Sequence, residues 1–194
     1  MKMNDHDGVM LPYIANILNN NVNGKRFLVI HTSGSHWNYH SRYPENFHKF
    51  SPDCNNKDEA NFSKSDPSNC NLDGLVNIYD NSILYTDFFL HNIITLLKDK
   101  NAFLIYASDH AESLGENGRY THGGDTTIEQ TTIPMIVWFS GKFQANNPEI
   151  KVAIKSHVNT EINHDYIFHS ILDCMGISSE IVDKNLSLCK LSNG

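Results

Sequence analysis

Three short apolar runs constrain the fold of this chain more than any other feature. They cover residues 27–30, 102–108 and 132–140, and each stops at polar residues, as strands buried on both faces do. Between the first two runs, residues 75–100 place apolar side chains at helical spacing. Strands that alternate with helices predict an α/β fold with a layered sheet.

Two shorter helices complete the predicted architecture. One begins at Tyr13, and the other covers residues 164–176 with Gly176 as its stop. A length of 194 residues with 40% hydrophobic content fits one domain over residues 1–194. Since no window approaches about 18 consecutive apolar residues, and no apolar segment follows the first lysine, the sequence as written predicts neither a membrane span nor an export signal.

Charge and histidine content narrow the function classes. The net charge is −7, from 15 Lys and Arg against 22 Asp and Glu, and no basic run occurs. This composition argues against a nucleic-acid-binding surface. The 11 histidines favour metal chemistry.

The four cysteines form two local pairs along the sequence. Cys54 and Cys70 bracket a polar segment, and Cys174 and Cys189 bracket a similar interval. A disulfide across each interval would restrict a loop, which predicts an oxidising compartment; four unrelated buried thiols are the alternative. Disulfides require export to an oxidising compartment, but the sequence shows no export signal. We therefore predict that this chain is the C-terminal part of a longer protein.

Metal-binding residue types gather after two of the predicted strands. Asp109 and His110 follow the second strand, and His36 follows the first. His122 comes after a turn through Gly115 and Gly118, which can fold the chain back. Because strand ends meet at one edge of a sheet, we expect one Asp and three His to meet there, a donor set that suits zinc. In the alternative, Asp109 caps a helix over residues 111–118 and His110 packs beneath it.

Four blocks, in order along the chain, resemble one enzyme family. They are IHTSGSHWNYHSRYPENFHKFSPDC, VNIYDNSILYTD, SDHAESLGENGRYTHG and TIPMIVWFS. They resemble the bacterial phosphoethanolamine transferases, lipid A modifying enzymes that include the colistin (polymyxin) resistance proteins. The resemblance implies an α/β/α sandwich of the alkaline phosphatase and sulfatase superfamily, here an incomplete C-terminal portion. It also implies a place at the periplasmic face of the inner membrane.

The same resemblance implies a chemistry and a set of site residues. In the family, a threonine takes phosphoethanolamine from phosphatidylethanolamine and passes it to lipid A or another envelope acceptor, with Zn²⁺ as the cofactor. By position, Asp109 and His110 match the zinc ligands, while His36 and His122 match histidines that contact the phosphate or a second zinc. The resemblance further implies a disulfide between Cys54 and Cys70.

Several other residues receive supporting roles. Tyr79, Asp80 and Asn81 lie on the predicted long helix, where we expect them to brace the site, and Glu112 is expected to support its loop. The segment Asp5-His6-Asp7 could imitate a metal cluster, but so near the N-terminus we expect it to be solvated.

The family's nucleophile and its zinc-binding glutamate match no residue of this chain, and Thr32 is not at the nucleophile's place. The isolated chain is therefore expected to be inactive. Three alternatives remain open: a non-catalytic remnant, one piece of a split gene, and a phosphoglycerol transferase or sulfatase. The sulfatase version is disfavoured because no C-x-P-x-R or S-x-P-x-R segment occurs. The sequence does not identify the acceptor or decide whether Cys174 and Cys189 pair.

Overall fold

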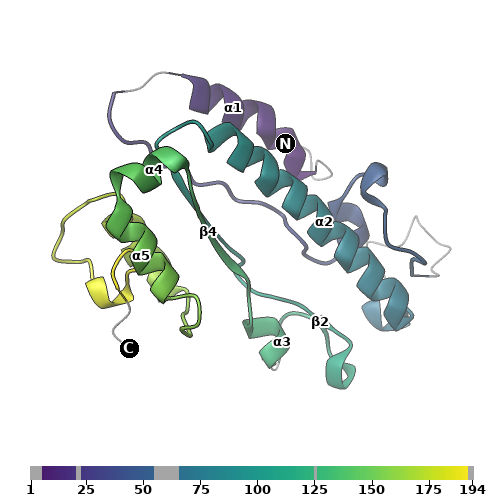
Figure 1. The fold of residues 1–194 in the computed structure, drawn as a ribbon. Coiled ribbons are helices and arrows are strands. Elements are labelled where there is room, and N and C mark those ends of the chain that lie inside the picture. The colour runs from purple at the N-terminus through teal and green to yellow at the C-terminus, as the bar shows by residue number, and fades with distance from the viewer. Residues whose placement is uncertain (1–5, 21–22, 55–65, 125, 192–194) are drawn as a thin grey trace. The chain divides into compact units, whose positions relative to one another are not determined.

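A computed structural model of the chain describes residues 6–20, 23–54, 66–124 and 126–191 (Figure 1). The chain forms two compact units. Unit 1 contains residues 1–21, 27–96 and 107–134, and unit 2 contains residues 22–26, 97–106 and 135–194. Over the described residues, none of the helices has the length and apolar content needed to cross a membrane.

The long helix α2, Leu72–Leu97, organises unit 1 and confirms the helix predicted from apolar spacing. One stripe of its side chains is buried, with Leu75, Ile78 and Phe89 each at most 1% exposed. Leu75 and Ile78 pack against the side chains of Tyr39 and Cys54. The core of unit 1 therefore joins α2 to the loop that carries residues 36–54.

The strand predicted over residues 27–30 is wrong. The backbone there has no strand assignment, and Phe27 and Val29 are 57% and 73% exposed. A strand needs a hydrogen-bonded neighbour, and among the described residues no strand pairs with this segment. Apolar sequence alone was therefore not sufficient to make it a strand.

The other two predicted strands are present. β1, Phe103–Ala107, and β4, Met135–Phe139, pair in a two-stranded sheet. Their side chains are only partly buried, and Ile136 is 43% exposed. The expected burial on both faces is therefore incomplete in the described structure.

Three helices follow β4 in unit 2: α4, Gly141–Asn146, α5, Pro148–Ser156, and α6, Asp165–Cys174. Ser140 caps α4, since its Oγ accepts a hydrogen bond from the backbone N–H of Phe143 at 3.1 Å. Gly176, with φ of +67°, ends α6 as predicted. Cys174 and Cys189 form a disulfide, which answers the question of their pairing.

The remaining elements of unit 1 are short. β2, Ser113–Leu114, and β3, Tyr120–Thr121, form an antiparallel hairpin in which Ser113 lies opposite Thr121. α3, Ile128–Thr131, follows the hairpin. α1, Leu11–Asn19, begins after a 3₁₀ turn at Asp7–Met10. Further 3₁₀ turns lie at Tyr39–Arg42, Glu45–Phe47, Pro67–Asn69 and Glu116–Gly118 of unit 1 and at Lys184–Leu186 of unit 2.

Candidate metal centre

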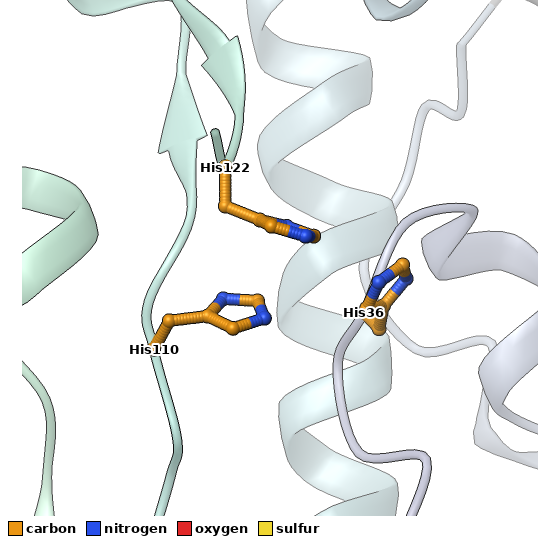
Figure 2. A group of neighbouring side chains, drawn as sticks. All are labelled: His36, His110 and His122. Carbon is orange, nitrogen blue, oxygen red and sulfur yellow. The ribbon is translucent and has the colours of Figure 1, made fainter. Parts of the chain in front are cut away.

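Three histidines from separate segments of unit 1 converge, as Figure 2 shows. One nitrogen from each of His36, His110 and His122 lies within 4.8 Å of the others. The ring centroids of His110 and His122 are 3.8 Å apart, and that of His36 lies 4.8 Å from His122. The predicted meeting of these histidines therefore occurs, although the described residues before His36 form no strand.

The β2–β3 hairpin returns the chain so that His122 reaches His110. Its turn uses Gly115 and Gly118, whose φ angles of +120° and +72° favour glycine. A side chain at Gly115 would also crowd the ring of Tyr120, 3.3 Å from the added carbon. The glycine turn predicted from sequence is therefore present.

The alternative reading of Asp109 as a helix cap is wrong. Residues 113–114 are a strand, and only a three-residue 3₁₀ turn follows at Glu116–Gly118. The carboxylate of Asp109 accepts a hydrogen bond from the backbone N–H of His110 at 3.1 Å. Asp109 follows β1 without starting a helix.

Each of the three imidazole rings has a hydrogen-bond acceptor at Nδ1. Where the partner of Nδ1 can only accept a hydrogen bond, the neutral imidazole must carry its proton on Nδ1. Its Nε2 atom then has the free lone pair. The rings of His110 and His122 thus have the tautomer in which Nε2 can bind a metal. Nδ1 of His36 faces both the oxygen of Trp37 and, at 3.4 Å, Nη2 of Arg42, so its contacts fit either tautomer. The acceptors are the backbone oxygen of Trp37 for His36, that of Ala111 for His110 at 3.1 Å, and Oε1 of Glu112 for His122 at 3.1 Å.

This donor set fits zinc. Neutral imidazole is a common zinc ligand, and two imidazole nitrogens on a tetrahedral zinc lie about 3.3 Å apart. The 4.8 Å span of the three donors is wider than this by about 1.5 Å. His36 is exposed and the other two are half-buried, so side-chain rotation can close the difference.

Asp109 lies beside the three histidines but outside their group. Its side chain is 84% exposed, and its Oδ1 is 3.9 Å from Nε2 of His110. Its assignment as a zinc ligand therefore remains a prediction.

A buried carboxylate and a buried phenol stand behind His122. The side chain of Glu112 is 4% exposed; its Oε1 contacts His122, and its Oε2 accepts a hydrogen bond from the hydroxyl of Tyr39 at 3.2 Å. Burial, followed by the charge of Glu112, raises the pKa of Tyr39 far above its usual value, so the phenol stays protonated and donates. Sequence reasoning expected Glu112 to support its loop and missed Tyr39, whose only signal was its place three residues after His36.

An arginine holds the backbone at His36. Nε of Arg42 donates to the oxygen of His36 at 2.8 Å, and its Nη2 donates to the oxygen of Trp37 at 3.0 Å. A guanidinium that spans two successive carbonyl groups fixes the chain at the metal-facing histidine.

The same loop is held on its other side by the N-terminal turn. Asp7 is 6% exposed, and its two oxygens accept hydrogen bonds from the backbone N–H groups of Ser33 and Gly34. The expectation that this segment is solvated is therefore wrong for Asp7, because the loop supplies two donors. The ring of His6 packs edge-on against Tyr85, and Asp5 lies outside the described residues.

The residues expected to brace the site from α2 lie in two places. Asn81 is fully buried, and its side chain accepts from the backbone N–H groups of Lys49 and Phe50 at 2.7 and 2.9 Å. The ring of Tyr79 packs edge-on against that of Tyr39, with centroids 4.9 Å apart. Tyr79 therefore supports the group behind His122, whereas the bracing roles of Asp80 and Asn81 remain predictions.

Cys54 and Cys70 are joined by a disulfide, with 5.0 Å between their Cα atoms. Cys54 is buried in the core of unit 1, and Cys70 packs against that core. The bond ties the end of the histidine-bearing loop to the start of α2.

Comparison with known proteins gives a consistent set of relatives. The family model described as sulfatase matches residues 2–177. The Kdo(2)-lipid A phosphoethanolamine 7''-transferase of Escherichia coli is 32% identical over 180 residues, which are 89% of this chain and 30% of that protein. The chain therefore spans about a third of the length of the curated relatives it matches.

Two solved structures share the fold. An integral membrane lipooligosaccharide phosphoethanolamine transferase A from Neisseria meningitidis superposes with a TM-score of 0.81 at 34% identity, over 94% of this chain and 34% of that one. The C-terminal periplasmic domain of EcEptC from Escherichia coli, in complex with Zn, gives a TM-score of 0.77 at 26% identity, over 100% of this chain and 53% of that one. These likenesses confirm the sulfatase-like α/β fold class.

Proposed function

Because this chain belongs to the sulfatase family, we propose that it carries the histidine centre of a zinc-dependent phosphoethanolamine transferase. The donor is phosphatidylethanolamine, and the acceptor is lipid A or another molecule of the cell envelope. The observation that carries this proposal is the convergence of His36, His110 and His122 in a chain similar to such transferases.

The described side chains divide the work of binding and orientation. His110 and Asp109 would hold zinc, and His36 and His122 would contact the phosphate or a second zinc. Bound zinc would polarise the phosphoryl group and favour the ionised nucleophile. The hydrogen bonds at Nδ1 would hold the rings of His110 and His122 in place during transfer.

We place the site at the periplasmic face of the inner membrane. Two disulfides favour an oxidising compartment. The similarity to the periplasmic domain of EcEptC and to the integral membrane transferase of Neisseria meningitidis supports the same location. Transfer of phosphoethanolamine to lipid A would add a cationic group to the envelope, and polymyxin resistance would follow from that change of charge.

The test is headgroup transfer by the protein purified from its native host. Vesicles that contain fluorescent phosphatidylethanolamine and lipid A should yield diacylglycerol and lipid A heavier by one phosphoethanolamine, both measured by mass spectrometry. His110→Ala or Asp109→Ala should abolish both products, and His122→Ala should reduce them strongly, because each change removes a group that holds the metal or the phosphate.

The control is His48→Ala. His48 is hydrogen-bonded to Asp53 at 2.7 Å and is not one of the three converging histidines, so this variant should keep its activity. Transfer of phosphoglycerol in place of phosphoethanolamine, or full activity in the Asp109→Ala and His110→Ala proteins, would refute the proposal.

A further inference from the structure

We propose that Glu112, held in place by Tyr39, is a positioning residue that fixes the tautomer of His122 and so presents its Nε2 atom to metal or phosphate. The proposal concerns the same centre and rests on the proposed function for its role in catalysis. Its structural part, the choice of tautomer, is tested separately.

Each carboxylate oxygen of Glu112 has one donor. Oε1 lies 3.1 Å from Nδ1 of His122, and Oε2 lies 3.2 Å from the hydroxyl of Tyr39. With the Tyr39 proton directed to Oε2, Oε1 is left to accept from the imidazole. The side chain of Glu112 is 4% exposed, so water competes little for either oxygen.

The backbone at Glu112 is fixed on both sides by a single residue. The N–H of Ala111 donates to the backbone oxygen of Gln130 at 2.9 Å, and Nε2 of Gln130 donates to Oγ of Ser113 at 3.1 Å. Gln130 is 5% exposed. Since both neighbours of Glu112 are bonded to the same residue of α3, Ala111 to its backbone oxygen and Ser113 to its side chain, the carboxylate is placed before any ligand binds.

Tyr39 is equally constrained. It is fully buried, and its ring packs edge-on against Trp37 and Tyr79, with centroid distances of 5.1 and 4.9 Å. A ring held between two others cannot swing its hydroxyl away from Glu112.

His122 differs in this respect from the other two histidines. The Nδ1 atoms of His36 and His110 face backbone carbonyl groups, whereas His122 faces a carboxylate. A carboxylate partner at Nδ1 holds the ring orientation. With its ring centroid 3.8 Å from that of His110, a His122 protonated on Nε2 would point a donor into the space where a metal binds.

The first measurement is nitrogen NMR of the metal-free 194-residue chain with ¹⁵N-labelled histidine. We expect His122 to carry its proton on Nδ1 in the wild-type chain. In Glu112→Gln, whose amide can accept or donate, and in Tyr39→Phe, we expect a mixture of the two tautomers. Because the wild-type spectrum is itself diagnostic, a variant that fails to fold does not remove the test.

The second measurement is zinc affinity by calorimetry, with zinc alone as the probe. Glu112→Gln should weaken binding by about 10-fold to 100-fold, the usual effect of removing a partner behind a ligand, and Tyr39→Phe should weaken it less. The matched controls should bind zinc as the wild type does. They are Glu116→Gln, which changes an exposed carboxylate bonded to the N–H of Leu114, and Tyr43→Phe, which removes a buried hydroxyl near Asn81.

An Nε2–H tautomer of His122 in the wild-type chain would overturn the proposal, as would unchanged zinc affinity in Glu112→Gln. Neither measurement contains lipid, so if the chain passes both and the protein purified from its native host transfers nothing, the proposed function alone is refuted. If the protein transfers phosphoethanolamine but His122 carries its proton on Nε2, this inference is refuted and the proposed function is not.

Discussion

Oδ2 of Asp7 accepts a hydrogen bond from the backbone N–H of Gly34 at 3.0 Å, two positions before His36. Oδ1 accepts from the N–H of Ser33 at 2.9 Å, and Asp7 is buried. The turn that precedes α1 therefore fixes the start of the loop that carries His36.

Replacing Asp7 should loosen this loop. Asp7→Ala leaves two backbone N–H groups without their acceptor, which we expect to lower the free energy of unfolding by about 1–3 kcal/mol. Denaturation in urea measures the loss. Asp66→Ala removes an exposed carboxylate that caps a 3₁₀ turn, and it should cost less. Equal losses in the two variants would show that Asp7 acts only as an ordinary cap.

Alkaline unfolding should depend on Tyr43. Burial, with the nearby charges of Asp53 and Glu45, raises the pKa of Tyr43 from 10.0 to about 12. The raised pKa contributes stability that is fully present below pH 10 and is lost as the pH rises through 12, because the unfolded chain releases this proton first.

The measurement is the free energy of unfolding between pH 9 and pH 12. Tyr43→Phe should reduce the slope of its decline, whereas Tyr13→Phe, at a position 72% exposed, should keep the wild-type slope. A wild-type slope in the Tyr43→Phe protein would contradict this assignment.

The fold was predictable where local pattern determines structure. The apolar spacing in residues 75–100 identified α2, and Gly115 and Gly118 identified the turn of the hairpin, because both signals act within a few residues. The segment at residues 27–30 was mispredicted because a strand also requires a neighbour, which composition does not reveal.

The site was predictable only in part for the same reason. His110 and His122 could be expected together from a strand end and a turn, whereas the strand from which His36 was placed does not form. The contact between Tyr39 and Glu112 joins residues 73 positions apart, and no periodic pattern links them. The buried contacts of Asp7 were equally invisible, because its charge suggested solvent.

Loss of the Cys54–Cys70 disulfide should destabilise unit 1. The two cysteines are 16 positions apart, and cross-linking a loop of this length contributes about 3 kcal/mol. Cys54→Ser/Cys70→Ser should show that loss in urea, and Cys174→Ser/Cys189→Ser, with a separation of 15, should show a similar one. Peptide mapping without reduction should recover both pairs from the native host; free thiols at 54 and 70 would contradict the bond.

Gly74 should not tolerate a side chain. A Cβ atom there would lie 2.6 Å from the backbone of Asp53 and Cys54, so α2 would have to move away from the loop. We expect Gly74→Ala to cost about 1–3 kcal/mol despite the higher helix propensity of alanine. Gly141→Ala, in α4 with nothing within 4 Å of the added carbon, should be neutral or stabilising by up to about 1 kcal/mol. Thermal denaturation of the two variants decides between these outcomes.

The two contacts of Glu112 differ in how soon a folding chain can make them. Glu112 and His122 are ten positions apart and share one hairpin, whereas Tyr39 and Glu112 are 73 apart. Closing the longer loop costs about 1.8 kcal/mol more in chain entropy, so we expect the carboxylate to meet the imidazole first and the phenol last. If so, Tyr39→Phe will speed unfolding and leave the refolding rate nearly unchanged in stopped-flow experiments. The centre would then gain its final rigidity only when the rest of unit 1 has closed around it.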